Sequence, residues 1–292
     1  MNIVIPGENS MDEYELLFHR VIQFAQNDMS VQAMVLFGSR ARTDKQADGY
    51  SDYDILFFVD HIDRFFKTDD WLKGISDYYI SFVEEAPAHG YARRVFFDDA
   101  MDMDFIFYNA SDAEKVTQNP MIQSWYGRGY AVVVDKIGYR DMARTSQTQK
   151  NGEIELTAQY YHNLTQTFWF HAIWAMKKLL RGEIWTGKRC IDGYMKELLR
   201  EMLEYREAGR KGSQYDVWYS GRFFDTWAGP ELLSGLNCAY GAYNRASLEA
   251  ALAKTMELFS AAAQETGRLY GFLYPAGAEA YAFAQVEKLM HS

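Results

Sequence analysis

The stretch that decides the fold is FGSRARTDKQADGYSDYD, residues 37–54. An apolar run, MVLF, leads into a Gly-Ser pair, and two aspartates one residue apart, Asp52 and Asp54, stand just before a second apolar run, ILFFV. Side chains alternate between the faces of a strand, so both carboxylates are expected on one face. Two carboxylates this close disfavour joint ionisation unless a cation lies between them. The stretch therefore predicts two strands joined by a polar loop, with a cation site where the second strand begins.

A divalent metal ion is the usual partner of such a pair. Mg²⁺ prefers carboxylate and phosphate oxygens and keeps some of its water ligands. Asp102 and Asp104 repeat the spacing on another predicted strand. If that strand lies beside the first, one of these two side chains becomes a third carboxylate of the site. An isolated pair of this kind is more often a pair of solvent-facing positions, so the surrounding residues decide between the two interpretations.

The Gly-Ser turn favours the metal interpretation. Gly38 permits a tight turn and a close backbone approach, and Gly38 and Ser39 then offer N–H and hydroxyl donors to phosphate oxygens. Arg40 and Arg42 add positive charge beside the turn. A phosphate-binding turn next to a metal-binding carboxylate pair suits nucleotidyl transfer, in which metal ions bridge a triphosphate and a carboxylate takes the proton of the attacking hydroxyl.

Hydrophobic periodicity divides the chain into two parts of different class. In the first part we expect strands at 31–37, 53–59, 79–84, 94–97, 101–108 and 129–136, and helices at 12–28, at 69–78 and from Ser111. In the second part we expect helices at 155–180, 191–203 and 248–259, and no strands. We therefore predict an α+β first domain, residues 1–140, and an all-helical second domain, residues 150–292, joined by the polar segment 140–153.

Charge and composition exclude several classes of function. The net charge is −10, and the first 150 residues account for most of it, with 24 Asp and Glu against 15 Lys and Arg. An acidic surface repels nucleic-acid phosphates, so we expect no nucleic-acid partner and favour a metal ion or a cationic small molecule. No segment approaches the roughly 20 apolar residues of a membrane span, and no signal-peptide pattern is seen. With only two cysteines, Cys190 and Cys238, a cytoplasmic location is expected.

At this point the sequence resembles a known superfamily. Gly38-Ser39, a loop over 40–51 and Asp52-x-Asp54 form the signature of the DNA polymerase β-like nucleotidyltransferases. One branch, the aminoglycoside 6-adenylyltransferases (streptomycin adenylyltransferases), resembles the chain along nearly its whole length. The matching stretches, in order, are VLFGSRAR, SDYDILFFV, MDMDFIFY, GYAVVVDK, FWFHAIWAMKKLLRGE, KELLREMLEY and GFLYP.

The resemblance implies a fold, an activity and two cofactors. The fold would be a polymerase β-like domain, with a mixed sheet flanked by helices, followed by a helical bundle. The activity would be transfer of AMP from ATP to the 6-hydroxyl of a streptomycin-type aminoglycoside with Mg²⁺, which confers antibiotic resistance. A lincosamide or another hydroxylated metabolite is the alternative acceptor. A nucleotide-binding module without catalysis is the alternative from another class.

The resemblance also carries over to single residues. Asp52 and Asp54 fall on the metal-binding pair of the family. Asp104 best fits the third carboxylate, as a metal ligand or as the general base, with Asp102 as the fallback. Lys196, in KELLR, matches a helix position from which a lysine could reach a phosphate; a solvated helix face is the other interpretation.

The long helix of the second part departs from the family in one place. This chain has Thr167 where relatives tend to have Glu, which leaves the acceptor open. On the same helix Trp169, Trp174 and His171 could face a ligand, although core packing is the commoner role of such side chains. The sequence does not indicate the oligomeric state.

Overall fold

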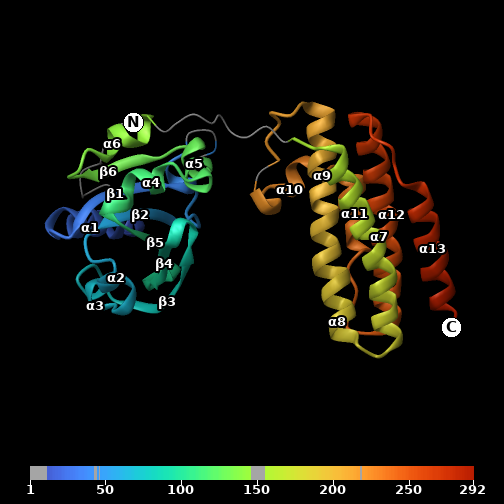
Figure 1. Ribbon diagram of the computed structural model, residues 1–292. Coiled ribbons are helices and arrows are strands. Elements are labelled where there is room, and N and C mark those ends of the chain that lie inside the picture. The colour runs from blue at the N-terminus through green and yellow to red at the C-terminus, as the bar shows by residue number, and fades with distance from the viewer. Residues whose placement is uncertain (1–11, 43–44, 46, 146–154, 218) are drawn as a thin grey trace. The chain divides into compact units, whose positions relative to one another are not determined.

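A computed structural model describes residues 12–42, 45, 47–145, 155–217 and 219–292. The chain divides into two units, Met1–Gly152 and Glu153–Ser292. The first unit holds a six-stranded mixed sheet with helices, and the described residues of the second unit are helical or irregular (Figure 1). The predicted α+β class, with a helical second part, is confirmed. The segment expected to be a linker begins instead with a helix, α6, Tyr139–Thr145.

The sheet of the first unit has the strand order β3-β4-β5-β2-β1-β6. Its strands are β1 Val31–Phe37, β2 Tyr53–Val59, β3 Tyr78–Ala86, β4 Gly90–Phe97, β5 Asp102–Asn109 and β6 Ala131–Asp135. Strands β2 and β5 pair in parallel, and the other neighbours pair antiparallel. The parallel pair matters for function, because two strands that run in the same direction begin at the same edge of the sheet.

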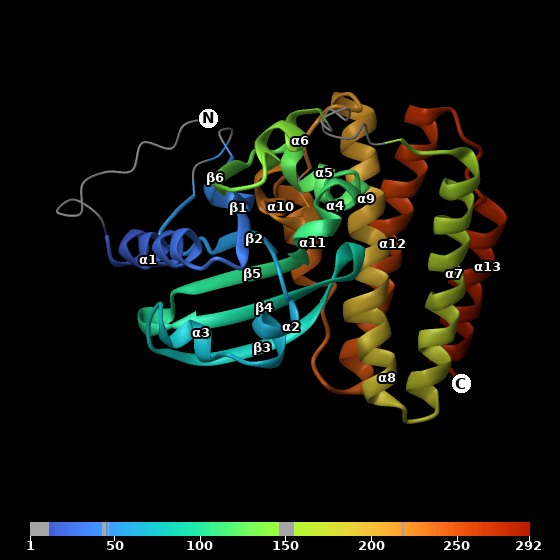
Figure 2. The same cartoon turned by 60° about the vertical axis from the view of Figure 1, so that its left-hand side comes forward.

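Helices cover both faces of this sheet (Figure 2). They are α1 Glu13–Asn27, α2 Asp63–Lys67, α3 Asp70–Lys73, α4 Ala113–Thr117, α5 Pro120–Gly127 and α6. Along β2, Ile55, Phe57 and Val59 pack in the cluster that includes α1 and α3 residues, whereas Leu56 and Phe58 pack with α4 to α6 residues. Burial on both faces explains why the strands read as continuous apolar runs instead of alternating patterns.

The second unit is a helical bundle. Its elements are α7 Ala158–Leu180, α8 Ile184–Lys188, the π-helical stretch η6 Arg189–Tyr194, α9 Met195–Lys211, α10 Phe224–Trp227, α11 Pro230–Asn237, α12 Arg245–Tyr270 and α13 Ala276–Met290. Helix α9 packs against α12, and α7 packs against α13 (Figure 2). Side-chain caps begin the two longest helices: Thr157 accepts from the Tyr160 N–H, and Asn244 accepts from the Ser247 N–H. Gly271, at φ +70°, ends α12.

Several expected elements differ from those observed. The helix expected at 69–78 is only α3, because β3 already begins at Tyr78. The helix expected from Ser111 is split into α4 and α5, because Pro120 cannot continue a helix and instead begins the next one. Helix α13 was not predicted from the sequence.

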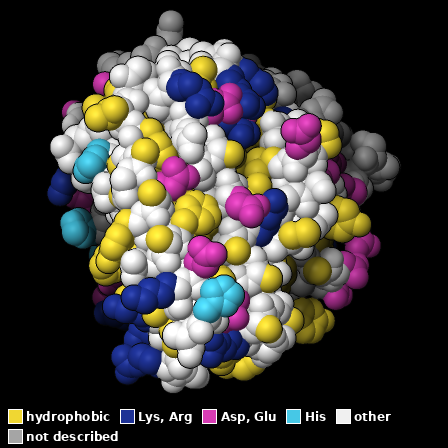
Figure 3. Space-filling model, turned by 90° about the vertical axis from the view of Figure 1, so that its right-hand side faces the viewer, with side chains coloured by type: hydrophobic (Ala, Val, Ile, Leu, Met, Phe, Trp, Pro, Cys, Tyr) yellow, Lys and Arg dark blue, Asp and Glu magenta, His cyan; other side chains and the backbone are white. Residues whose placement is uncertain are grey.

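Charged and hydrophobic side chains are mixed on the face of the helical unit that carries α13 (Figure 3). Figure 3 shows the face on which α13 lies, where hydrophobic side chains are scattered among acidic and basic ones, and where Lys and Arg side chains gather near the top and at the lower left of the view. Among the described residues, no helix is both long enough and apolar enough to cross a bilayer.

Candidate active site

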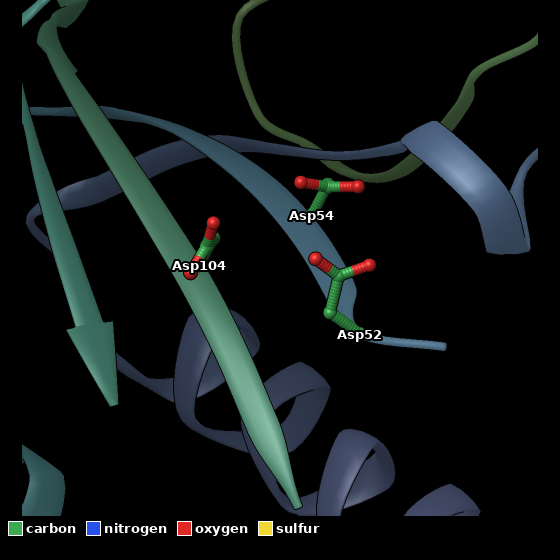
Figure 4. Close-up of side chains that lie close together, drawn as sticks. All are labelled: Asp52, Asp54 and Asp104. Atoms are coloured by element: carbon green, nitrogen blue, oxygen red, sulfur yellow. The ribbon is translucent and has the colours of Figure 1, made fainter. Parts of the chain in front are cut away.

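The parallel pairing of β2 and β5 brings three carboxylates together. Asp54 lies directly opposite Asp104 in the register of the two strands, and Asp52 precedes β2 on the same face. One carboxylate oxygen from each of Asp52, Asp54 and Asp104 lies within 4.8 Å of the other two. Figure 4 shows the three side chains directed toward a common space, two from the β2 edge and one from β5. The expectation that the two aspartate-bearing strands are neighbours is confirmed.

The Gly-Ser turn lies against this group. Gly38 has φ +71°, a left-handed conformation that favours glycine. A β-carbon at Gly38 would lie 1.9 Å from the Asp54 Oδ2 atom. The turn and the carboxylate are therefore packed so closely that no other residue fits at position 38 without moving Asp54.

Ser39 is buried beside the same carboxylates, in the short 3-10 helix Gly38–Arg40. Its side-chain oxygen has no hydrogen-bond partner among the described residues. A buried hydroxyl without a partner is costly, and such groups in native structures usually mark a place where a ligand, water or ion belongs. Ser39 is therefore suited to donate a hydrogen bond to a phosphate oxygen.

Asp104 has a protein cation as its partner. The Arg94 guanidinium, from β4, donates to Asp104 Oδ2 and also to Glu84 on β3, at 2.6 Å. Burial raises the pKa of Asp104 to about 6, which the nearby Arg94 charge opposes and the Asp52 charge reinforces. A positive charge beside Asp104 therefore favours its ionised form.

Asp102, the fallback for the third carboxylate, is used differently. The Tyr14 hydroxyl, from α1, donates to the Asp102 carbonyl oxygen and to Asp102 Oδ1, the latter at 3.0 Å. Burial and the Asp102 charge raise the pKa of Tyr14. Asp102 ties helix α1 to the start of β5, so Asp104 is the better candidate for the metal site.

Arg40 is directed toward the loop instead of standing free. Its Nε and one terminal nitrogen donate to the Ser51 carbonyl at 3.0 and 2.8 Å. The guanidinium also lies 4.4 and 4.2 Å from the ring centres of Tyr14 and Tyr53. Arg40 therefore closes the loop that ends at Asp52, and its contact with phosphate stays a prediction.

Lys196 also departs from its expected role. It is buried in the helical unit, where its ammonium donates to the Ile191 carbonyl at 3.0 Å and to Thr255 Oγ1 at 2.7 Å. Burial lowers the pKa of Lys196 to about 8. An ammonium held by two internal acceptors does not extend to a phosphate, so Lys196 joins α9 to α12 instead. Thr167 is half-buried on α7, and its carbonyl oxygen accepts a hydrogen bond from His171 Nδ1 at 2.8 Å.

The donor set fits a hard divalent cation. Three carboxylates whose oxygens lie within 4.8 Å of one another are ligands that Mg²⁺ accepts. The unpartnered Ser39 hydroxyl and the Gly38 turn supply donors on the adjacent side. This arrangement can hold a metal ion together with the phosphates that the metal would bridge.

Comparison with known protein families identifies the family of this chain. The family model described as streptomycin adenylyltransferase matches residues 11–287. The chain belongs to the streptomycin adenylyltransferase family. Members of this family are nucleotidyltransferases, and the chain is an enzyme of that class.

Other members of the streptomycin adenylyltransferase family are distant in sequence. The aminoglycoside 6-adenylyltransferase of Campylobacter jejuni is 23% identical over 263 residues, which span 87% of this chain and 88% of the relative. That of Bacillus subtilis is 23% identical over 210 residues, 69% of this chain and 72% of the relative. A crystal structure of an aminoglycoside 6-adenyltransferase from Bacillus subtilis aligns with 97% of this chain and 100% of its own, at 17% identity and a TM-score of 0.47.

Two residues, Arg94 and Tyr14, were not assigned to the site from the sequence. Arg94 was assigned only to a strand, and Tyr14 only to an amphipathic helix. Arg94 meets Asp104 because β4 and β5 pair antiparallel with these two residues opposite each other. No local pattern signals that pairing. Glu84 reaches Arg94 from β3, which pairs antiparallel with β4.

Proposed function

We propose that this enzyme transfers AMP from ATP to a hydroxyl of an aminoglycoside of the streptomycin type, with Mg²⁺ as cofactor. The acceptor oxygen would bond to the α-phosphorus of ATP, the bond from that phosphorus to the bridging oxygen would break, and pyrophosphate would leave. The observation that carries the proposal is the group of three carboxylates beside a glycine turn whose neighbouring serine hydroxyl lacks a partner.

Each residue of the group has a role in this proposal. Asp52, Asp54 and Asp104 would hold Mg²⁺, which neutralises charge that develops on the transferred phosphoryl group. Gly38 and Ser39 would bind phosphate oxygens, and Arg40 would keep the loop before Asp52 in place. The proton of the acceptor hydroxyl would pass to a carboxylate of the site or to solvent.

The acceptor class rests on the relatives and on charge. Three relatives at 20 to 23% identity carry the name aminoglycoside 6-adenylyltransferase. The excess of acidic residues in the first part of the chain also suits a cationic acceptor. Thr167 stands where relatives are expected to have Glu, so the acceptor panel has to test which drug is the substrate.

A pyrophosphate-release assay with ATP and Mg²⁺ tests the proposal. The acceptor panel should include streptomycin, other aminoglycosides and lincosamides, with transfer of labelled AMP to the drug as the second readout. We expect release that depends on an aminoglycoside and that is absent in Asp54→Asn while circular dichroism stays unchanged. Turnover by Asp54→Asn at the wild-type rate would refute the metal site. Response to lincosamides alone would refute the acceptor class.

A further inference from the structure

An exposed apolar patch lies on the same face of the sheet as the three carboxylates. It consists of Ile80 and Phe82 on β3 and Phe96 on β4, whose exposed fractions are 57, 49 and 40%. We call these three side chains the β3–β4 platform. Neighbouring apolar side chains that are exposed together are typical of surfaces that bind a ligand or a partner. The position of the platform relative to the carboxylates indicates what it binds.

The strand register shows which side chains share this face. Residues that lie opposite each other on neighbouring strands point to the same side of a sheet. One such row, which crosses β1, β2, β5, β4 and β3 in that order, consists of Phe37, Asp54, Asp104, Arg94 and Phe82. Phe96 lies opposite Asp102 and Ile80 in the next row. The platform therefore continues the carboxylate face across two further strands, β4 and β3 (Figure 2).

Helices cover only part of this face. Ala92 and Ile106, which lie opposite each other on β4 and β5, are buried in the cluster that includes α4 to α6 residues. The platform lies in the rows nearer the start of β5, outside that cluster. The platform and the carboxylates all belong to the first unit. They form one continuous surface within that unit.

The order of the strands favours the acceptor as the occupant of the platform. The Gly38–Ser39 turn, to which the proposed function assigns the departing phosphates, follows β1 at one end of the row. In an in-line displacement the attacking and leaving oxygens lie on opposite sides of the phosphorus. With the carboxylates of β2 and β5 in the middle of the row, the attacking hydroxyl approaches from the side of β4 and β3. The platform lies on that side.

Two charged side chains border the platform. Arg94 donates from Nε to Glu84 Oε1 at 2.6 Å and from a terminal nitrogen to Asp104 Oδ2. Glu84 is 44% exposed, and its Oε2 atom has no hydrogen-bond partner among the described residues. An ionised carboxylate only accepts hydrogen bonds. Glu84 therefore suits a ligand that carries hydroxyl or ammonium donors.

We propose that the β3–β4 platform binds one ring of the acceptor, which packs on Phe82 and Phe96 and donates hydrogen bonds to Glu84. The Phe rings offer apolar contact area, and their faces attract cationic groups such as ammonium or guanidinium. That this ring belongs to an aminoglycoside rests on the proposed function. The proposal makes these three side chains determinants of acceptor specificity within the first unit.

Calorimetry with streptomycin as the probe tests the platform apart from catalysis. The full chain is titrated in the presence of Mg²⁺ and α,β-methylene ATP, in which the bond that would break is replaced, so that no transfer occurs. Phe82→Ala and Phe96→Ala should each weaken streptomycin binding about fivefold. Glu84→Gln, which keeps a carbonyl oxygen for Arg94 but loses the charge, should weaken it about tenfold.

The neighbouring positions of β3 supply matched controls. Val83 and Glu85 are exposed, and they lie opposite Arg93 and Tyr91, on the other face of the sheet. Val83→Ala and Glu85→Gln should bind streptomycin as wild type does. In steady-state kinetics the three platform variants should raise the KM for streptomycin by the same factors as in calorimetry. The KM for ATP should stay unchanged, because the phosphate end of the row is untouched.

The outcomes distinguish this proposal from the proposed function. Streptomycin binding that depends on Phe82 but leads to no transfer would keep the platform and overturn the proposed function. Transfer to streptomycin with unchanged affinity and KM in Phe82→Ala, Phe96→Ala and Glu84→Gln would overturn the platform alone. If streptomycin neither binds nor accepts AMP, both proposals are overturned. Unchanged streptomycin binding by Phe82→Ala together with a lower Tm, or with loss of a dimer in light scattering, would show that protein covers the patch and would also overturn the platform.

Discussion

A β-carbon at Gly38 would lie 1.9 Å from Asp54 Oδ2, so the Gly38 turn and the Asp54 carboxylate are in direct contact. The chain connects them through the loop over 40–51, and Arg40 closes that loop by donating to the Ser51 carbonyl. Antiparallel pairing places Phe37 opposite Asp54, which fixes the turn above the carboxylate. The close contact explains why glycine is required at the start of the turn.

Gly38→Ala should therefore abolish activity. The new methyl group would displace Asp54, and alanine at φ +71° is strained, so we expect at least a hundredfold loss of transfer and about 1 to 3 kcal/mol of stability. Gly49→Ala is the matched control, because a β-carbon there meets nothing within 4 Å. Urea denaturation and the pyrophosphate assay measure both effects. Equal activity of the two variants would contradict the close contact.

Asp104→Asn and Asp102→Asn should differ in metal binding. Asp104 lies with Asp52 and Asp54 in the proposed metal site, whereas Asp102 holds Tyr14. We expect Asp104→Asn to weaken Mn²⁺ or Mg²⁺ binding by about tenfold or more, together with activity. Asp102→Asn should keep metal affinity and lose some stability. If Asp104→Asn binds metal as wild type does and only kcat falls, Asp104 acts as the general base instead of as a ligand.

Arg94→Met should strengthen metal binding. The Arg94 guanidinium contacts Asp104, and a metal ion in the proposed site would contact the same carboxylate, so the two cations would repel each other. Removal of Arg94 should raise Mn²⁺ affinity by about fivefold, or about 1 kcal/mol. Arg64→Met, which removes a similarly exposed arginine paired with Asp28, is the control. Weaker metal binding by Arg94→Met would instead show that Arg94 positions Asp104 for the metal.

Lys196 should give the protein a measurable dependence of stability on alkaline pH. Its pKa is lowered by burial to about 8, so between about pH 8 and the ordinary lysine range the unfolded chain binds more protons than the folded one. In that window the free energy of unfolding should rise with pH more steeply in wild type than in Lys196→Met. The two slopes should differ by up to about 1.4 kcal/mol per pH unit.

Urea denaturation of wild type and Lys196→Met in buffers from pH 8 to 10 measures this difference in the free energy of unfolding. Lys177→Met, on the exposed side of α7, is the control and should show no such rise relative to wild type. A difference between wild type and Lys196→Met that stays flat or falls with pH would contradict the buried position of the ammonium.

Local chemistry made much of this protein predictable from its sequence. The strands beside Gly38 and Asp52, the α+β class and the helical second part all follow from apolar periodicity, turn residues and the spacing of the aspartates. These features depend on residues that are near one another in the chain. The proximity of Asp52 and Asp54 also follows from their spacing, because alternate residues of a strand lie on one face wherever that strand lies.

Only the tertiary structure decided which residues from distant segments meet. The parallel register of β2 and β5 selected Asp104, and the pairing of β4 with β5 brought Arg94 to it. Packing of α9 on α12 turned Lys196 inward, and the pairing of β3 with β4 placed Phe82 on the carboxylate face. Strand register and helix packing are settled by contacts across the whole core, and no local pattern of residues specifies them.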